Sequence, residues 1–292
     1  MIKVSVIIPV FNDPDRVFEC IKGIIRQSYP IDLIELIVVD NASIPALELD
    51  NKELSGVNLK LLRCSKPGSY AARNVGVRAA SGKVLAFIDA DCWPDPEWIN
   101  SGVSALIDKG KDSFLGGDVK IIKPEKPSAV AVYQHLIGFC QAENITERKF
   151  TGTLNLFCFS ELFRSVGEFE ERLLSGGDRE WSWRAVSRGF SIFYEPKAVV
   201  YTQPRTTLRG AIRQARRIVA GRKTLKQLGL TYLGQQNLAK KRSAWQASLW
   251  IITHKELSLK DRFQVFLVAS IIRVAEFVEQ WRLAAGKEAE RR

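Results

Sequence analysis

Two carboxylates one residue apart, Asp89 and Asp91, directly follow the apolar run at residues 84–88. A short apolar run of this kind is typical of a buried strand, so both side chains are expected where a strand leaves its sheet. Paired carboxylates bind hard divalent cations, and such a cation in turn binds a diphosphate. Asp-x-Asp also occurs by chance in surface turns. By itself the pair leaves two interpretations open, a metal and nucleotide site or a solvated turn.

The segments that must position this pair alternate between strand-like and helix-like patterns. Residues 4–10 and 34–39 are rich in β-branched residues, and a third strand is expected at 57–62. Helical patterns occupy residues 17–25 and 70–80. This order predicts an α/β fold with a Rossmann-like, mostly parallel central sheet flanked by helices.

Polar residues follow three of the expected strands, at Asn12, Asp40 and Asp89. In sheets of this kind the ligand lies outside the carboxyl ends of the strands, so the pattern predicts a nucleotide crevice. The sequence contains no Gly-x-Gly-x-x-Gly motif after the first strand and no Gly-x-x-x-x-Gly-Lys-Ser/Thr motif. Dinucleotide dehydrogenases and P-loop NTPases are therefore disfavoured.

The basic charge of the chain is confined to its C-terminal part. The 292 residues are 46% hydrophobic and 26% charged, as in ordinary globular proteins, with a net charge of +11. Residues 1–204 hold 24 Lys and Arg against 26 Asp and Glu, whereas residues 205–292 hold 19 against 6. We therefore predict a catalytic domain at 1–205 and a basic helical extension at 206–292.

Two amphipathic helices are expected in this extension. The first has an apolar stripe from Leu208 to Val219 with arginines on much of the remaining surface, and the second places apolar residues from Phe263 to Trp281 near one side. Basic amphipathic helices suit the headgroup region of an anionic membrane. Packing on the catalytic domain or on a partner subunit is the alternative that the pattern leaves open.

Cysteine usage and hydropathy bear on the compartment. The five cysteines are odd in number and include no Cys-x-x-Cys pair, which favours buried thiols in a reducing compartment over a disulfide framework. The N-terminal residues lack the pattern of a signal peptide, and the longest uncharged stretch, 127–142, is too short to cross a bilayer. We expect cytoplasmic action, with peripheral contact to the inner face of the cell membrane.

Five segments resemble the family 2 glycosyltransferases, which have the GT-A fold. They are SVIIPVFN at residues 5–12, VVDNAS at 38–43, ARNVG at 72–76, FIDAD at 87–91 and GGDREWSWR at 176–184. Their order and spacing match the family, and the resemblance covers about residues 1–205. It implies an enzyme that transfers a sugar from a nucleoside-diphosphate sugar, with inversion at the anomeric carbon.

The resemblance implies a role in nucleotide binding for the first two motifs. Pro9, Phe11 and Asn12 match the segment beside the base, and Asp40 matches a carboxylate that accepts a hydrogen bond from the uracil N–H. A UDP-sugar is therefore the expected donor. Phe11 as a core aromatic and Asp40 as a turn cap are the structural alternatives.

The next two motifs are expected to bind the diphosphate and a metal ion. Arg73 matches an arginine beside the base and diphosphate, Asp89 a partner of the ribose or, through water, of the metal, and Asp91 the principal metal ligand. The resemblance implies Mn²⁺ or Mg²⁺ bridging the carboxylate and both phosphates, which neutralises charge on the leaving diphosphate.

The fifth motif places Asp178 at the family's general base, with a helix N-cap as its structural alternative. The sequence departs from the family at Gly177, which replaces a common glutamate, and at Thr202, which replaces a histidine that often binds metal. The acceptor-side candidates, with core packing an equal interpretation for the tryptophan, are Gly117, Asp118, Glu180, Trp181 and Arg184.

The sequence therefore predicts a metal-dependent, inverting glycosyltransferase that uses a glycan or lipid-linked acceptor in polysaccharide or cell-envelope glycan synthesis. A noncatalytic nucleotide- or glycan-binding protein of the same fold is the first alternative. A nucleic-acid-binding protein that uses the basic tail is the second, and no nucleic-acid motif in the sequence supports it.

Overall fold

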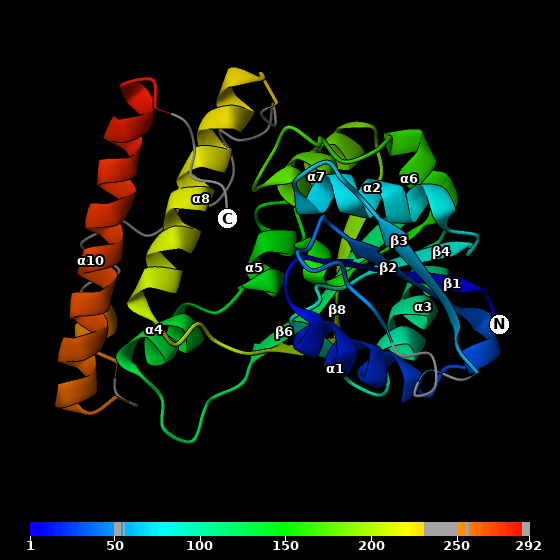
Figure 1. Cartoon of the computed structure of the whole chain (residues 1–292), viewed down its shortest axis with the longest axis horizontal. Helices are drawn as coiled ribbons and strands as arrows, with labels where there is room; N and C mark the ends of the chain where they lie inside the picture. The colour runs from blue at the N-terminus through cyan, green and yellow to red at the C-terminus, as the bar shows by residue number, and fades with distance from the viewer. Residues whose placement is uncertain (50–53, 55, 231–249, 255–256, 288–292) are drawn as a thin grey trace. The chain divides into compact units, whose positions relative to one another are not determined.

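The computed structural model describes the chain except residues 50–53, 55, 231–249, 255–256 and 288–292 (Figure 1). The chain divides into two compact units. The first unit comprises residues 1–120, 140–173 and 177–202, and the second comprises 121–139, 174–176 and 203–292. The second unit thus takes two short segments from within the region that the sequence assigns to the catalytic domain.

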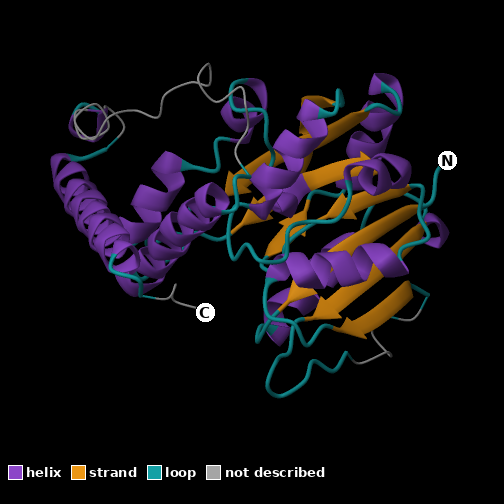
Figure 2. Cartoon of the chain, turned by 90° about the horizontal axis from the view of Figure 1, so that it is seen from above, coloured by secondary structure: helices purple, strands orange, loops and turns teal. Residues whose placement is uncertain are grey.

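An eight-stranded sheet forms the centre of the first unit, in the order β3-β2-β1-β4-β7-β6-β8-β5. The strands are β1 (Val4–Val10), β2 (Ile34–Asp40), β3 (Asn58–Arg63), β4 (Val84–Phe87), β5 (Cys92–Pro94), β6 (Ser113–Ile121), β7 (Leu156–Phe159) and β8 (Ser191–Thr202). Figure 2 shows the strands side by side. The predicted α/β class is confirmed.

The sheet is mixed rather than mostly parallel. Strands β3, β2, β1 and β4 pair in parallel, whereas β7 pairs antiparallel with both β4 and β6, and β5 pairs antiparallel with β8. The regular alternation of strands and helices ends at β4. After β4, a tight turn leads to β5, and the connection from β6 to β7 contains α4 (Ala129–Ile137), α5 (Gln141–Thr146) and η2 (Thr153–Asn155). These connections differ in length and form, so they do not return every strand in the same direction.

Helices cover the sheet on both faces. In the first unit they are α1 (Pro14–Ile25), α2 (Ser69–Ala79), α3 (Trp98–Lys109), α5 (Gln141–Thr146), α6 (Ser160–Val166) and α7 (Gly177–Ser187), with short 3-10 turns η1 (Ile31–Leu33) and η2 (Thr153–Asn155). Figure 1 shows α2, α6 and α7 above the strands and α1 and α3 below them. Strand β2 is accordingly buried along its whole length, which explains why residues 36–39 are all apolar.

The register of the parallel strands aligns the polar residues that follow them. Val10 at the end of β1 pairs with Asp40 at the end of β2, and Ile7 of β1 pairs with Phe87 at the end of β4. Asp89 lies two residues beyond Phe87. The carboxyl ends of β1, β2 and β4 therefore present their polar residues at one edge of the sheet, as the sequence predicts.

A buried carboxylate, Glu35, ties the opposite edge of these strands together. Its oxygens accept hydrogen bonds from Lys60 Nζ at 2.7 Å, Ser81 N at 2.7 Å, and the Ser5 hydroxyl. Burial by itself raises the pKa of Glu35, but these hydrogen bonds outweigh it and lower the pKa to about 2. Sequence reasoning missed this residue because it interrupts an otherwise apolar strand without a recognisable motif.

The second unit is helical. The helices described over their whole length are α4 (Ala129–Ile137), α8 (Leu208–Gln227) and α10 (Leu259–Ala284). One buried cluster joins all three, and its members are Val130, Ala211, Ala215, Val268 and Ile272. Thr207 and Ser258 cap α8 and α10 through their side-chain oxygens. Among the described residues, the structure contains no helix that combines the length and apolar character of a membrane span.

Candidate active site

The two aspartates of the Asp-Ala-Asp triplet occupy the turn between β4 and β5. The Cys92 N–H donates to the Asp89 carbonyl oxygen at 3.1 Å, which closes this turn. Both aspartates are half-buried. Because Cys92 of β5 pairs with Thr202 of β8, the Thr202 hydroxyl lies 3.4 Å from the Asp91 carbonyl oxygen. The position at which the family often has a histidine therefore lies beside the aspartates, and here it holds an uncharged hydroxyl.

Arg73 of α2 reaches the same turn. Its guanidinium pairs with the Asp89 carboxylate, and only 3% of its side chain is exposed. The Arg73 Nε is buried without a hydrogen-bond partner among the described residues. A buried guanidinium donor of this kind is suited to a phosphate oxygen.

Asp40 and Asn12 hold the loops that follow β1 and β2. The Asp40 carboxylate accepts from the Ser43 N–H at 2.9 Å and the Leu47 N–H at 3.2 Å, and it pairs with Arg63 at 3.1 Å. Burial raises the pKa of Asp40, but these donors outweigh it and hold the pKa below its usual range. Asn12 Oδ1 accepts from the Ile44 N–H at 2.9 Å. Asp40 thus caps a turn, and its carboxylate oxygens retain lone pairs for a further donor.

Asp178 lies in the first turn of α7, where the helix dipole favours a negative charge. Its Oδ1 accepts two hydrogen bonds, from the Tyr70 hydroxyl at 3.1 Å and from the Arg179 N–H at 2.9 Å. Burial raises the pKa of Tyr70 well above its ordinary value, and the nearby Asp178 charge raises it further. Tyr70 therefore keeps its proton and is the donor in this contact.

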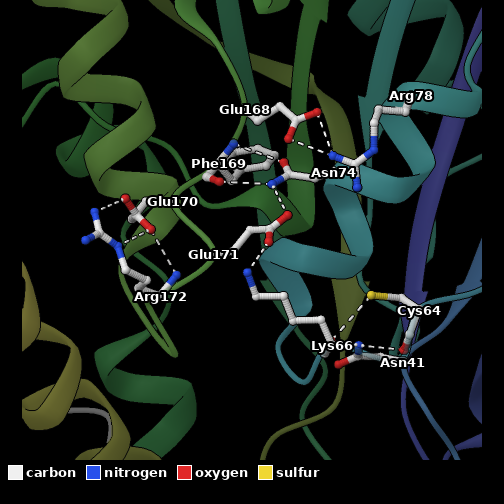
Figure 3. A network of polar contacts seen from close by, with 10 residues as sticks. All are labelled: Asn41, Cys64, Lys66, Asn74, Arg78, Glu168, Phe169, Glu170, Glu171 and Arg172. Atoms are coloured by element: carbon white, nitrogen blue, oxygen red, sulfur yellow. Dashed lines mark hydrogen bonds and ion pairs between the residues drawn. The ribbon is translucent and has the colours of Figure 1, made fainter.

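Asn74 of α2 fixes the segment that leads to α7 (Figure 3). Its side chain accepts from the Phe169 N–H at 3.0 Å and donates to the Phe169 carbonyl oxygen at 2.9 Å and to Glu171 at 3.0 Å. Lys66 pairs with the other oxygen of Glu171 at 2.5 Å. Asn74 is fully buried. Asn74, which belongs to the ARNVG motif but has no role assigned from the sequence, therefore anchors the segment that contains Phe169 and Glu171.

Asn41 fixes the loop before α2 in the same way (Figure 3). Its amide donates to the carbonyl oxygens of Cys64 at 3.3 Å and Lys66 at 2.7 Å, and its Oδ1 accepts from the Gly68 N–H at 2.8 Å. Both ends of the loop are therefore tied to the end of β2. These two asparagines hold α2, which carries Tyr70 and Arg73.

Three of the acceptor-side candidates have structural roles in α7. Trp181 is fully buried and its indole N–H donates to the Gly167 carbonyl oxygen at 2.8 Å, so it offers no face to a sugar. Glu180 pairs with Arg184 at 2.7 Å, and Arg184 also donates to the Val166 carbonyl oxygen at 2.6 Å. This corrects the acceptor-side expectation for Trp181 in favour of the core interpretation. Arg184 ties α7 to the end of α6.

The remaining candidates lie on β6. A Cβ at Gly117 would stand 2.0 Å from the Ala198 carbonyl oxygen, so glycine is required where β6 approaches β8. The Asp118 carboxylate accepts from the Val119 N–H at 3.0 Å. Burial and the Asp118 charge raise the pKa of Tyr194 to about 12. Gly117 therefore shapes the sheet, and Asp118 supplies a carboxylate on this strand.

The carboxylates of Asp89 and Asp91 could bind a divalent cation that takes its remaining ligands from other molecules. Asp89 and Asp91 supply carboxylate oxygens, which Mg²⁺ and Mn²⁺ prefer. Within the part of the chain that the structure describes, no three His, Cys, Asp or Glu side chains gather as a closed metal site. An ion held here would take its other ligands from phosphate and water.

The family model Glycosyl transferase family 2 matches residues 5–160 of the chain. The chain belongs to this family. Glycosyltransferase AglE of Haloferax volcanii is 37% identical over 194 residues, 65% of this chain and 64% of AglE. The pre-mycofactocin glycosyltransferase of Mycobacterium tuberculosis is 29% identical over 214 residues, 70% of this chain and 44% of the relative. The chain thus spans less than two thirds of the length of these family 2 relatives.

Solved glycosyltransferases show the same fold. A mannosyltransferase from Pyrobaculum calidifontis, in complex with GDP-Man and Mn²⁺, has a TM-score of 0.58 at 21% identity, covering 98% of this chain and 79% of that one. Staphylococcus aureus TarS 1–349 in complex with UDP-GlcNAc has a TM-score of 0.54 at 17% identity, covering 99% and 93%. The predicted GT-A fold is therefore confirmed.

Proposed function

We propose that the chain is a metal-dependent glycosyltransferase that transfers a sugar, with inversion, from a UDP-sugar to a glycan or lipid-linked acceptor in polysaccharide or cell-envelope glycan synthesis. One observation carries this proposal. Helix α2 places Arg73 on Asp89 of the triplet and Tyr70 on Asp178, so diphosphate-binding and proton-accepting groups are held by one element. A helix that only stabilised the fold would not require both the Arg73–Asp89 ion pair and the Tyr70–Asp178 hydrogen bond.

We assign binding of the nucleotide sugar to residues at the ends of β1 and β2 and on α2. Pro9, near the end of β1, and Phe11 and Asn12, directly after it, are assigned to the nucleotide base, and Asp40 to the uracil N–H. Arg73 donates to the diphosphate through its Nε, to which no described residue offers a hydrogen-bond acceptor.

The metal and the base are assigned to the remaining carboxylates. Asp91 holds Mn²⁺ or Mg²⁺, with Asp89 as a second ligand or a partner of the ribose. The bound ion supplies charge neutralisation for the leaving diphosphate. Asp178 takes the proton of the acceptor hydroxyl during a single direct displacement, and such a displacement inverts the anomeric carbon.

Nucleotide binding is the direct test of this proposal. Calorimetry with UDP, GDP, CDP and ADP, each with and without Mn²⁺, should show UDP as the tightest ligand and at least about tenfold tighter binding with the metal. Tighter binding of GDP would replace the UDP-sugar assignment. Nucleotide binding without turnover of any nucleotide sugar would favour the noncatalytic relative of the fold.

We further propose that the second unit binds the anionic cytoplasmic face of the cell membrane. Helix α10 has apolar residues on two sides: one side packs in the helical cluster, and the other is an exposed stripe. The α10 stripe consists of Leu259, Phe263, Leu267, Ile271, Val274, Phe277, Val278 and Trp281, which are 41% to 81% exposed. At about 100° per residue, they fall within an arc of about 120°.

Two further features support a lipid surface as the partner. Aromatic side chains at both ends of the α10 stripe, Phe263 and Trp281, are the type that enters the headgroup region. Residues 205–292 hold 19 Lys and Arg against 6 Asp and Glu, which complements anionic lipid. The sequence predicts apolar residues from Phe263 to Trp281 near one side of this helix, and both of these side chains are exposed.

Replacing Phe263, Phe277 and Trp281 together with serine should weaken binding to vesicles of equal phosphatidylglycerol and phosphatidylcholine by at least about tenfold, because burying each aromatic contributes about 1.5–3 kcal/mol. Co-sedimentation measures the loss. The control replaces Leu61, Ile107 and Ile122, which are 41%, 51% and 38% exposed, with serine and should bind as the wild type does. Equal binding of both variants would contradict the proposal.

A further inference from the structure

The contact between Tyr70 and Asp178 joins residues 108 positions apart. Tyr70 is 6% exposed, and its ring packs against Phe169 with the ring centroids 5.8 Å apart. Because an ionised carboxylate only accepts hydrogen bonds, the Tyr70 hydroxyl donates. Figure 1 shows the two helices that carry these residues, α2 and α7, next to each other.

Gly177 makes this contact possible. A Cβ at Gly177 would lie 2.8 Å from two ring carbons of Tyr70, closer than such atoms approach in folded proteins. The family motif commonly has a glutamate at this position, and here the tyrosine ring occupies the space of that side chain. The departure at Gly177 and the presence of Tyr70 are therefore two parts of one arrangement.

The same face of α2 reaches the aspartate triplet. Tyr70 and Arg73 are three residues apart, which places them on neighbouring positions of the helix surface. The Arg73 guanidinium carbon lies 5.5 Å from the centre of the Tyr70 ring, and the guanidinium pairs with Asp89. The position of Tyr70 is therefore fixed relative to the carboxylates of the donor side.

The two oxygens of Asp178 are unequal. Oδ1 accepts from Tyr70 and from the Arg179 N–H, whereas no described residue donates to Oδ2. Oδ2 faces Gly152, where a methyl group in place of the glycine hydrogen would stand 3.7 Å from it. The carboxyl torsion of aspartate is soft, so two donors on one oxygen are what fixes the direction of the other.

We propose that Tyr70 is a positioning residue that fixes Oδ1 of Asp178 and thereby directs Oδ2 to the acceptor hydroxyl; this inference rests on the proposed function. As the acceptor oxygen bonds to the anomeric carbon, its proton passes to Oδ2. The bond between the anomeric carbon and the diphosphate oxygen breaks, and its electron pair leaves with the diphosphate. Tyr70 keeps its own proton throughout.

The test is nucleotide release from the UDP- and GDP-sugars of glucose, N-acetylglucosamine and mannose, with Mn²⁺ and with water as the acceptor. Tyr70→Phe should lower kcat by about tenfold to a hundredfold, the usual range for a hydrogen bond to a charged group, with donor KM unchanged. The control is Tyr29→Phe. Tyr29 is 4% exposed and its hydroxyl donates to the Ile2 carbonyl oxygen at 2.6 Å, so this variant should keep the wild-type kcat.

A double-mutant cycle separates positioning from general stability. In the Asp178→Asn background, Tyr70→Phe should change the residual rate by less than about twofold, because Tyr70 acts through that carboxylate. An equal loss in both backgrounds, or a kcat for Tyr70→Phe equal to that of Tyr29→Phe, would overturn the inference while leaving Asp178 as the base. An Asp178→Asn variant with the wild-type rate, or no release from any donor, would overturn the proposed function and this inference together.

Discussion

Asp178→Asn should lower nucleotide-sugar turnover by about 10³-fold, within the usual range for removing a general base. The amide has nearly the shape of the carboxylate, and its oxygen still accepts from Tyr70 at the position of Oδ1. Its NH₂ group then replaces Oδ2 and carries no lone pair that can take a proton. The measurement is the steady-state rate of nucleotide release, with UDP affinity and Tm as companions.

Binding and stability should distinguish this loss from damage to the fold. UDP and Mn²⁺ should bind to Asp178→Asn as to the wild type, since Asp178 is assigned to the acceptor side. Asp108→Asn is the matched control, because the Asp108 side chain is 75% exposed and outside the site. Turnover of Asp178→Asn above about a tenth of the wild-type rate would remove Asp178 from the mechanism.

Asp91→Asn should abolish the dependence of nucleotide binding on Mn²⁺ and lower turnover by about 10³-fold, because charge on the leaving diphosphate is then left without its cation. Calorimetry should give the same UDP affinity for this variant with Mn²⁺ as the wild type shows in EDTA. Asp91 is half-buried, and its Oδ1 lies 3.8 Å from the Cys92 thiol, a contact that an asparagine oxygen can also accept.

Asp89→Asn is the informative comparison for that variant. Asp89 pairs with Arg73, whose side chain is 3% exposed, so its loss leaves a buried guanidinium without its counter-charge. Asp89→Asn should therefore lower Tm. Retention of metal-dependent UDP binding by Asp91→Asn would contradict its assignment as the principal ligand.

The sequence predicts the parallel half of the sheet and the alignment of its polar ends because both depend on local patterns. The apolar run of β4 followed by Asp89 places that carboxylate at the strand end without knowledge of any distant residue. The antiparallel half was not predicted, since strand direction after β4 depends on the turn before β5 and on the path of the long connection through α4 and α5.

The site residues that sequence reasoning missed act over long separations. Tyr70 belongs to no motif, Asn74 belongs to a motif that gave it no role, and their partners, Asp178 and Phe169, are 108 and 95 positions away. Trp181 illustrates the converse: an aromatic residue beside the base suggests sugar stacking, yet it fills the core. The roles of such residues follow from packing between helices rather than from composition.

The interleaved chain path of the second unit has a consequence for how the extension can be inherited or engineered. Its helical cluster includes Val130 of α4, and Gly221 of α8 approaches the Ser175 carbonyl oxygen so closely that a Cβ would stand 2.3 Å from it. Residues 121–139 and 174–176 precede the extension in the sequence but are part of its fold. The extension is therefore not an independent module. A fragment that ends at residue 205 keeps α4 but lacks the apolar residues of α8 and α10 that pack against Val130.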